Sequence, residues 1–349
     1  MKQLQPLPPP RPWWKRVDVF LIFLVGVVVL LALLLHCGGG TAVVSVSGES
    51  AASETAAASY PAPALCRREV DEMPQSGPPV RFLMLNTENY FVQGEKQRSR
   101  YVNHPKPEKE REAVAEVIAS VRPEIIGLIE MGGSLALVDL QQRLAERGLN
   151  YPYSRVLIRG GEDRALALLS VFPIACDDSC AHHGLFGQHA RKMLRGILDV
   201  TLRLNDGRLF CFLGVHLKSR LGDERAAEAL RYREAQTVSQ YIQQKMKGLP
   251  NLPMLVFGDL NDNPKDASIR LLEQGSSVSS ALRRLNPKDS RGEEWTLYFR
   301  RGNSYNTFDH IFLNAPMKRR LKRRAACGVV DIPAAQTASD HRALWCELR

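Results

Sequence analysis

This sequence has few cysteines, no internal repeat and no excess of acidic residues, and each of these features excludes a class of protein. Seven cysteines in 349 residues are too few for a fold built mainly on disulfides. With 25 Gly, 21 Pro and 24% charged residues, the composition also excludes collagen, a coiled coil and wholesale disorder. Because 47 Lys and Arg outnumber 37 Asp and Glu, the net charge of +10 favours acidic partners such as nucleic acid, phosphorylated ligands or anionic membranes.

Lys and Arg are absent from residues 36–66, and a continuous apolar run at residues 19–35 comes directly before that stretch. At 1.5 Å per helical residue the run reaches nearly across a hydrocarbon core of about 30 Å. No convincing small-residue cleavage site follows, so a transmembrane signal-anchor at residues 17–36 is favoured over a cleaved signal peptide. The basic segment 1–16 places the N-terminus in the cytoplasm, and the remainder of the chain outside the cytoplasmic (inner) membrane, in the periplasm or the extracellular space.

Large side chains are nearly absent from the segment that follows the apolar run. Much of it consists of Gly, Ala, Ser, Thr and Val, which cannot bury enough surface to fold, so residues 37–77 are interpreted as a flexible tether. The remaining residues, 78–349, contain no internal repeat and no second linker of comparable length. One large domain is therefore expected there.

Strands and helices are interspersed along residues 78–349. Apolar runs bounded by turn residues predict strands at 80–85, 125–129, 165–170, 197–204, 209–216, 254–257, 296–299, 307–313 and 343–348. Helical spacing predicts helices at 109–120, 137–147, 223–247 and 266–274. The turn Asn205-Asp206-Gly207 predicts a hairpin between two of the strands. This mixture favours an α/β fold of two mostly antiparallel sheets flanked by helices over an all-parallel sheet.

Acids, amides and histidines fall at or near the ends of these strands. Taken singly, each has an ordinary structural reading as a cap, a turn residue or a satisfied strand-end amide. Together they supply oxygen ligands suited to a hard divalent cation, and imidazoles beside them, on elements that can aim them. The residues are Asn86, Glu88, Glu130, His216, Asp259, Asn261, Asp309, His310, Asp340 and His341.

Six motifs, in order, carry a resemblance to a known family: LNTEN (85–89), GLIE (127–130), VHLKS (215–219), GDLND (258–262), FDHIFLN (308–314) and SDH (339–341). The set resembles the endonuclease/exonuclease/phosphatase superfamily, the DNase I-like metallo-phosphoesterases. The resemblance covers nearly all of residues 80–349. It implies a four-layered α/β sandwich that hydrolyses phosphoesters with Mg²⁺ or Mn²⁺.

The resemblance also implies a role for each matched residue. Glu130 is expected to bind the metal, helped by Asn86 and Glu88, with Asp340 near the ion. Asp259 is expected to orient or deprotonate the attacking water, and Asn261 to hold the scissile phosphate. His341 and Asp309 match an acid/base pair, and His216 matches a second histidine that contacts the phosphate or protonates the leaving group. A phosphodiester is anionic, so its hydrolysis needs this combination of cation, base and acid.

Weaker signals lie between the motifs. Arg191 and Arg195 precede a predicted strand and are expected either to contact phosphate or to lie on a plain surface. Cys176 and Cys180 lack the second ligand pair of a zinc cluster, so a local disulfide or two ordinary thiols is expected.

The combined sequence evidence predicts a membrane-anchored, metal-dependent nuclease that cleaves phosphodiester bonds. The alternatives are a phosphatase or phosphodiesterase of phospholipids, inositol phosphates or other small phosphoesters, and a non-catalytic binding module on the same fold. The expected partners are nucleic acid or another phosphoester substrate, and the membrane through the N-terminal helix. No protein partner can be inferred.

Overall fold

The computed structural model describes residues 67–94, 104–160, 162–275, 277, 280–321 and 326–349. The predicted cytoplasmic segment 1–16, the anchor 17–36 and most of the tether 37–77 lie outside the described residues. Among the helices within the described ranges, none is both long enough and apolar enough to span a bilayer.

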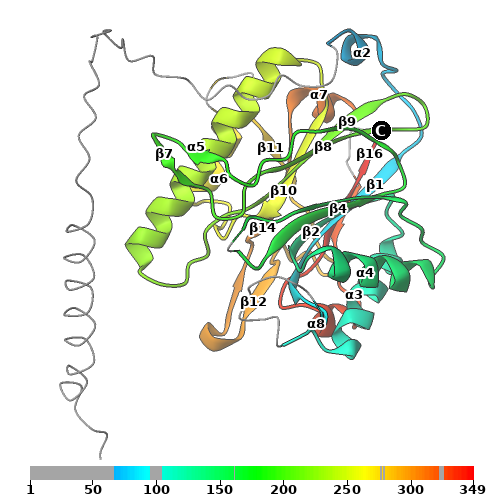
Figure 1. Ribbon diagram of the computed structural model, residues 1–349, viewed down its shortest axis with the longest axis vertical. Helices are drawn as coiled ribbons and strands as arrows, with labels where there is room; N and C mark the ends of the chain where they lie inside the picture. The colour runs from blue at the N-terminus through cyan, green and yellow to red at the C-terminus, as the bar shows by residue number, and fades with distance from the viewer. Residues whose placement is uncertain (1–66, 95–103, 161, 276, 278–279, 322–325) are drawn as a thin grey trace, which may run out of the picture. The chain divides into compact units, whose positions relative to one another are not determined.

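Two six-stranded sheets form the centre of the fold (Figure 1). In the first, β1 and β2 run parallel and the other neighbours are antiparallel. Its strand order is β15 (Cys327–Val329), β16 (Leu344–Leu348), β1 (Val80–Tyr90), β2 (Ile125–Met131), β4 (Ala165–Ser170) and β3 (Tyr153–Leu157).

The second sheet repeats this plan, because β9 and β10 run parallel and the other neighbours are antiparallel. Its strand order is β11 (Arg283–Arg284), β14 (Asp309–Leu313), β10 (Met254–Asp259), β9 (Leu209–His216), β8 (Leu198–Arg203) and β5 (Ile174–Asp177). Two small ribbons project from the sheets, one made of β6 (Gly184–Leu185) and β7 (Gln188–Lys192), the other of β12 (Leu297–Phe299) and β13 (Ser304–Asn306).

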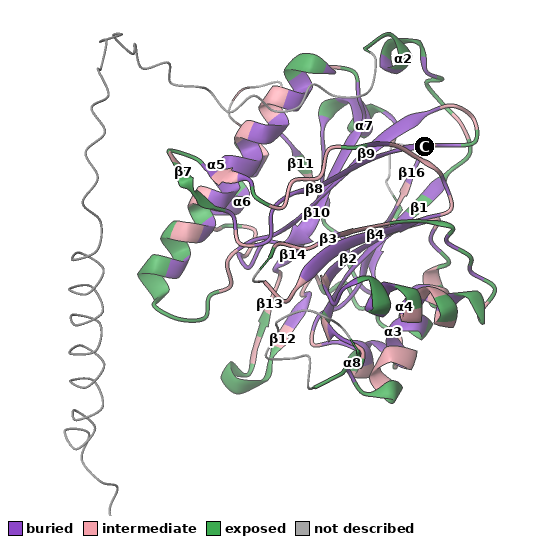
Figure 2. Cartoon of the chain, viewed as in Figure 1, coloured by how far each residue is buried: buried purple, intermediate pink, exposed green. Residues whose placement is uncertain are grey.

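Helices cover the outer face of each sheet, and the faces they cover are buried (Figure 2). α3 (Glu108–Val121), α4 (Ser134–Ala145) and the short α8 (Ala335–Ala338) pack on the first sheet. α5 (Glu224–Gly248) and α6 (Ala267–Gln274) pack on the second. The remaining short helices are α2 (Arg67–Glu72), η3 (Arg300–Gly302) and α7 (Ala315–Arg319). The predicted architecture of two mostly antiparallel sheets flanked by helices is confirmed.

A third core lies between the two sheets and is built around aromatic rings. The ring of Phe82 lies 5.3 Å from that of Phe212 and 5.1 Å from that of Phe257, centroid to centroid. The Phe257 ring fits because Gly127 and Gly214 face it, and a Cβ atom at either position would collide with the ring. Burying these rings removes apolar surface from water at roughly 25 cal/mol per Å², which stabilises the packed sheets.

Several local sequence signals are confirmed by the structure. Asp223 caps α5, since its side chain accepts a hydrogen bond from the Ala226 backbone N–H at 2.8 Å. The predicted hairpin joins β8 and β9, and Gly207 in its turn has a φ of +87°. Cys176 and Cys180 are both free thiols, so the disulfide considered for them is not formed.

The folded domain includes residues that come before the predicted boundary at residue 78. Helix α2 lies within the segment interpreted as a tether, and Val70 and Met73 are buried in the core beneath the second sheet's helices. The small-residue composition that predicts a tether has ended by this point, because a Val and a Met supply apolar surface that can be buried. The catalytic domain therefore includes residues N-terminal to the predicted boundary at residue 78.

Candidate active site

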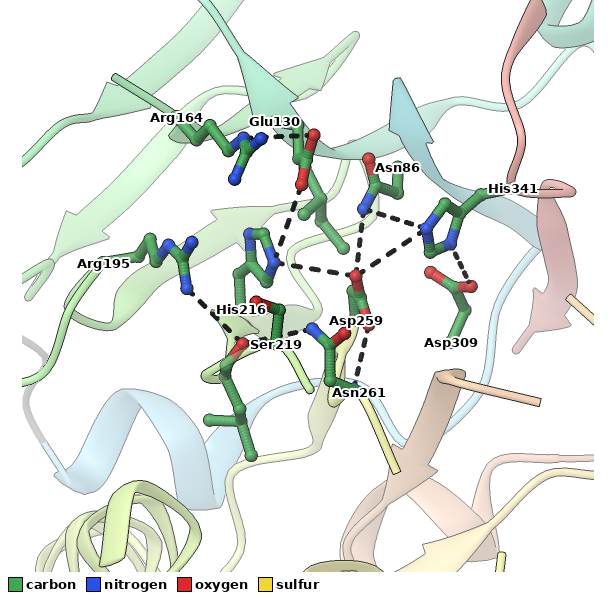
Figure 3. A network of polar contacts seen from close by, with 12 residues as sticks. Asn86, Glu130, Arg164, Arg195, His216, Ser219, Asp259, Asn261, Asp309 and His341 are labelled. Atoms are coloured by element: carbon green, nitrogen blue, oxygen red, sulfur yellow. Dashed lines mark hydrogen bonds and ion pairs between the residues drawn. The ribbon is translucent and has the colours of Figure 1, made fainter. Parts of the chain in front are cut away.

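Polar side chains gather at one end of both sheets, where neighbouring strands stop together. Asp259, the last residue of β10, pairs in register with His216 of β9 on one side and Asp309 of β14 on the other. Because β1 and β2 are parallel, as are β9 and β10, the carboxyl ends of each pair meet at one edge of their sheet. The side chains brought together in this way are Asn86, Glu130, His216, Asp259, Asp309 and His341 (Figure 3).

The Asp259 carboxylate lies at the centre of this group (Figure 3). Its Oδ2 accepts a hydrogen bond from Asn86 Nδ2 at 3.0 Å. The same oxygen lies 3.6 Å from His216 Nε2 and 3.9 Å from His341 Nε2. Asp259 is 2% exposed, so these neighbours replace water around its carboxylate. One carboxylate therefore has a histidine on each side, an arrangement suited to proton transfer.

His341 forms a pair with a second buried carboxylate. Its Nδ1 lies 2.7 Å from Asp309 Oδ2, which leaves Nε2 directed toward Asp259 and Asn86. Asp309 is itself fixed by Thr296, because the Asp309 backbone N–H donates to the Thr296 hydroxyl at 3.0 Å. Ser339 holds the histidine segment, since its hydroxyl donates to the Asn86 carbonyl and accepts from the His341 backbone N–H. The ring orientation of His341 is therefore determined by fixed partners.

Burial and neighbouring charges shift the pKa values of these groups. Burial, together with the Asp309 and Glu130 carboxylates, raises the pKa of Asp259 to about 7 against the opposing charge of His341. Burial alone would lower the pKa of His341, but the Asp309 carboxylate outweighs it and raises that pKa well above its ordinary value. Burial lowers the pKa of His216 well below the ordinary value, and Arg195 and Arg164 add to the effect. The two histidines therefore favour opposite charge states.

The backbone at the site departs from regular strand geometry. Four non-glycine residues have a left-handed φ: Glu88 (+48°), Asn89 (+58°), Glu130 (+61°) and Asn261 (+54°). The ladders that join β1 to β2 and β2 to β4 shift register in the same region. Bulges and left-handed residues of this kind redirect side chains near functional sites, at a cost of order 1–3 kcal/mol each. At Glu130 this geometry accompanies a break in the inward–outward alternation of β2.

Arg164, which belongs to none of the six motifs, contacts the predicted metal-binding glutamate. Its Nε lies 3.3 Å from Glu130 Oε2 and donates to Asn89 Oδ1 at 2.7 Å. It stands directly before β4, whose first residue Ala165 pairs in register with Met131. The only sequence signal for Arg164 is its position as a cation just before a buried strand. That signal does not identify Arg164 as a site residue until the pairing of β4 with β2 is known.

Asn261 and Arg195 line the side of the group that lies toward His216 (Figure 3). The Asn261 amide donates to the Leu217 carbonyl at 3.2 Å, and its backbone N–H donates to Asp259 Oδ1 at 2.9 Å. Arg195 is buried and reaches the same carbonyl at 3.5 Å. Arg195 Nε, His216 Nδ1 and Asp309 Oδ1 are buried and have no hydrogen-bond partner within the described residues. Such unsatisfied polar atoms are costly unless a ligand or water completes them.

The other predicted site residues lie at different distances from this group. Asp340 Oδ1 is 4.0 Å from His341 Nε2, so Asp340 lies at the edge of the site. Glu88 reaches the site through Asp340, because its carboxylate accepts the Asp340 backbone N–H at 3.0 Å. Arg191 is exposed on β7, and the described contacts do not bring it to the group. The arginine nearer in sequence to β8, Arg195, is the one that approaches His216.

The donor chemistry of the site fits a hard divalent cation. Within the described ranges, no three His, Cys, Asp or Glu side chains converge as a metal-ligand cluster. Mg²⁺ binds through only one or two carboxylates and keeps its other positions for water and phosphate oxygens. The Glu130 carboxylate and the Asn86 amide oxygen are oxygen donors of the kind that a hard cation accepts, and they flank a region where several acids repel one another. A cation there would offset that repulsion.

Comparison with known proteins agrees with this geometry. The family model described as "Endonuclease/Exonuclease/phosphatase family" matches residues 93–341. Comparison with curated protein sequences yields no match. Among solved structures, the human Nocturnin catalytic domain with bound sulfate anion is 20% identical, with a TM-score of 0.54 over 78% of this chain and 94% of that one.

Two further structures share the fold. Truncated TDP2 from Caenorhabditis elegans is 16% identical, with a TM-score of 0.54 over 78% of this chain and 98% of that one. The endonuclease/exonuclease/phosphatase from Bacteroides vulgatus is 13% identical, with a TM-score of 0.57 over 78% of this chain and 99% of that one. At these identities the structures establish the fold alone. The match of the family model over more than half of the chain shows that the chain belongs to the endonuclease/exonuclease/phosphatase family.

Proposed function

We propose that this member of the endonuclease/exonuclease/phosphatase family is a nuclease that hydrolyses phosphodiester bonds with Mg²⁺ or Mn²⁺. The observation that carries the proposal is the position of Asp259, which lies between the His341–Asp309 pair and the neighbouring His216 and Glu130. Such a group contains a base, an acid and an oxygen ligand within reach of one phosphate. The net charge of +10 favours a polyanionic substrate over a neutral one.

In the proposed hydrolysis, each side chain of the group has a separate role. Glu130 and Asn86 would hold the divalent cation, which would supply charge neutralisation at the phosphate oxygens and orientation of the water. Asp259, with its pKa near 7, accepts a proton from the water that attacks phosphorus. His341, kept protonated by Asp309, donates a proton to the leaving oxygen as the P–O bond breaks.

Two further groups hold the phosphate in place. His216 is neutral and buried, so it can direct an N–H at a phosphate oxygen without exchanging a proton with solvent. The Asn261 amide and the Arg195 guanidinium lie on the same side of the site, and Arg195 Nε has no partner among the described residues. Preorganised donors of this kind stabilise the charge that develops on the phosphate.

We also propose that the enzyme is anchored in the cytoplasmic membrane with its catalytic domain outside. The support is the apolar run at residues 19–35 and the basic residues before it. Treating intact cells and permeabilised cells with protease tests this topology. Degradation of the domain only after the cytoplasmic membrane is breached would contradict it.

A substrate panel tests the proposed activity. The full chain in mild detergent is incubated with plasmid DNA, single-stranded DNA, sphingomyelin and inositol phosphates, each with Mg²⁺ or Mn²⁺ and each with excess EDTA. We expect DNA cleavage that stops on addition of EDTA. An Asp309→Asn variant purified in parallel controls for contaminating nuclease.

The other outcomes favour the alternatives. Metal-dependent turnover of sphingomyelin or inositol phosphates without cleavage of DNA would replace the nuclease with a lipid or small-phosphoester hydrolase. No metal-dependent turnover of any substrate would favour a binding module on the same fold.

A further inference from the structure

A cavity of about 430 Å³ lies beside the catalytic group, on the side of Ser339 and Asp340. One wall comes from the segment that forms the β12–β13 ribbon, and the other from α8 and the residues before it. Its volume falls in the range of pockets that bind small organic molecules. The cavity shares Ser339 and Asp340 with the catalytic group, but none of the roles assigned above uses its other walls.

Aromatic rings dominate the ribbon wall of the cavity, which contains Trp295, Tyr298 and Tyr305. The Tyr298 and Tyr305 rings are stacked, with centroids 4.8 Å apart and planes at 27°. The Trp295 ring lies 4.9 Å from that of Tyr305 at a tilt of 59°. Tyr305 is 60% exposed. A set of mutually supported rings that remains open to solvent is suited to stacking against another flat ring.

The charges around the cavity select against a cationic ligand. The Arg342 guanidinium lies 4.1 Å from the Trp295 ring centroid, so a cation–π contact already covers one face of that ring. Asp289 fixes this arginine through a hydrogen bond of 2.8 Å. Arg300 also lines the cavity, as does Arg291, which is paired with Asp289 and Glu293, and one of the two acids of the cavity, Asp331, is engaged by Ser290. A flat neutral ring that carries a phosphate matches these walls better than a quaternary ammonium group does.

The ribbon is tied directly to the catalytic histidine segment. The Tyr298 backbone N–H donates to the Asp340 carbonyl at 3.2 Å, and the Arg342 N–H donates to the Thr296 carbonyl at 2.7 Å. Between these two bonds, Leu297 forms a β-bridge with His341. A ring held in the cavity is therefore adjacent to the histidine that faces the scissile phosphate.

From this juxtaposition we infer that the cavity binds an unpaired nucleobase of the nucleotide next to the scissile phosphate. The inference rests on the proposed nuclease function and adds a substrate class, single-stranded nucleic acid. A base within a duplex is stacked and paired, so it cannot enter the cavity without being flipped out. Stacking of a base on aromatic side chains is tolerant of sequence, so little preference among the four bases is expected.

The test compares two substrates that share a phosphate backbone. One is a labelled single-stranded oligo(dT), and the other is an oligomer of equal length built of tetrahydrofuran abasic units. The full chain is measured with Mg²⁺ as wild type, Tyr305→Ala and Tyr305→Phe. Tyr153→Ala is the matched control, because Tyr153 is an exposed tyrosine on β3, outside the residues that line the cavity.

We expect the wild type to show a KM for oligo(dT) about 5- to 150-fold below that for the abasic oligomer, the range that corresponds to stacking one base. Tyr305→Ala should raise KM for oligo(dT) by several-fold, change kcat little and leave the abasic oligomer unaffected. Tyr305→Phe should restore the wild-type KM because it keeps the ring. Tyr153→Ala should match the wild type on both substrates.

Three results would overturn the inference. Equal KM values of the wild type for the two oligomers would exclude a base subsite while leaving the nuclease proposal intact. An equal loss by Tyr305→Ala on both oligomers would assign that residue a structural role only. Cleavage of sphingomyelin vesicles but of neither oligomer would remove the proposed function, and the base subsite with it.

Discussion

The strands β9 and β10 have two different regions along their length, an apolar body and a polar end. In the body, Phe257 packs against Phe82 and two glycines, and no charged group intervenes in this contact. At the end, Asp259 is buried beside Asp309 and Glu130, and burial together with this repulsion raises its pKa. The body stabilises the fold, whereas the end holds like charges and left-handed residues that oppose folding. Changes in the two regions should therefore have opposite consequences.

The largest expected effect comes from the polar end. A His341→Gln variant keeps a side chain that can donate to Asp309 but cannot exchange a proton at neutral pH. We expect kcat to fall by about 10²- to 10⁴-fold, the usual contribution of an acid–base residue. Steady-state cleavage of DNA measures this loss, and thermal unfolding of the same sample checks that the variant is folded at the assay temperature. Retention of most of kcat would remove His341 from the mechanism.

The apolar body should respond in the opposite way. Phe257→Ala leaves a cavity between the sheets and should lower the free energy of unfolding by about 3–5 kcal/mol. Below the melting temperature, kcat should change much less than in the histidine variant. Urea unfolding measures the stability, and Phe186→Ala, at a ring that is 40% exposed, provides a control expected within about 0.5 kcal/mol of wild type. A loss in Phe257→Ala no greater than in this control would contradict the assignment.

A smaller effect is expected at the predicted metal ligand. Glu130→Gln removes one carboxylate and should raise the Mg²⁺ concentration that gives half-maximal activity. Loss of a residue that only supports a metal ligand weakens metal binding by roughly 10- to 100-fold, and loss of the ligand itself should have at least this effect. Titration of activity with Mg²⁺ measures the shift. An unchanged Mg²⁺ requirement would exclude Glu130 as a ligand.

The smallest effect concerns Asp289, which holds Arg342 beside the aromatic cavity. Burial alone would raise the pKa of Asp289, but hydrogen bonds from Arg342 and from two backbone N–H groups outweigh it and lower that pKa. A carboxylate with a lowered pKa adds stability above its unfolded pKa of about 4, and that stability is lost as the pH falls through the folded pKa. The gap in melting temperature between wild type and Asp289→Asn should therefore narrow below about pH 4. A gap that does not vary with pH would contradict this role.

The bodies of the strands were predictable from the sequence, but their mutual arrangement was not. The strand at residues 209–216 is observed with the predicted bounds, because a continuous apolar run between turn residues carries a strong local signal. The left-handed conformation of Glu130 and its contact with Arg164 depend on how β2 pairs with β4. Such pairing joins segments that are distant in the chain, and hydrophobic periodicity contains no information about it.

The candidate site shows the same division. Asp259, Asp309 and His341 were expected from the family motifs, and the structure places them together. Arg191 and Arg195 were indistinguishable in the sequence, yet only Arg195 approaches His216, since Arg191 lies on an exposed ribbon strand. The three aromatic residues of the cavity gave no signal before the β12–β13 pairing brought their rings together.

The most direct test of the division between body and end is to measure DNA cleavage and thermal unfolding on one preparation of Asp259→Asn. The substitution keeps the shape of the side chain, removes the base, and removes the cost of burying a carboxylate beside Asp309 and Glu130. We predict that cleavage falls by about 10²- to 10⁴-fold while the melting temperature equals or exceeds that of the wild type. Cleavage within a few-fold of the wild type, or a lost activity that is matched by a clear loss of stability, would contradict the central claim.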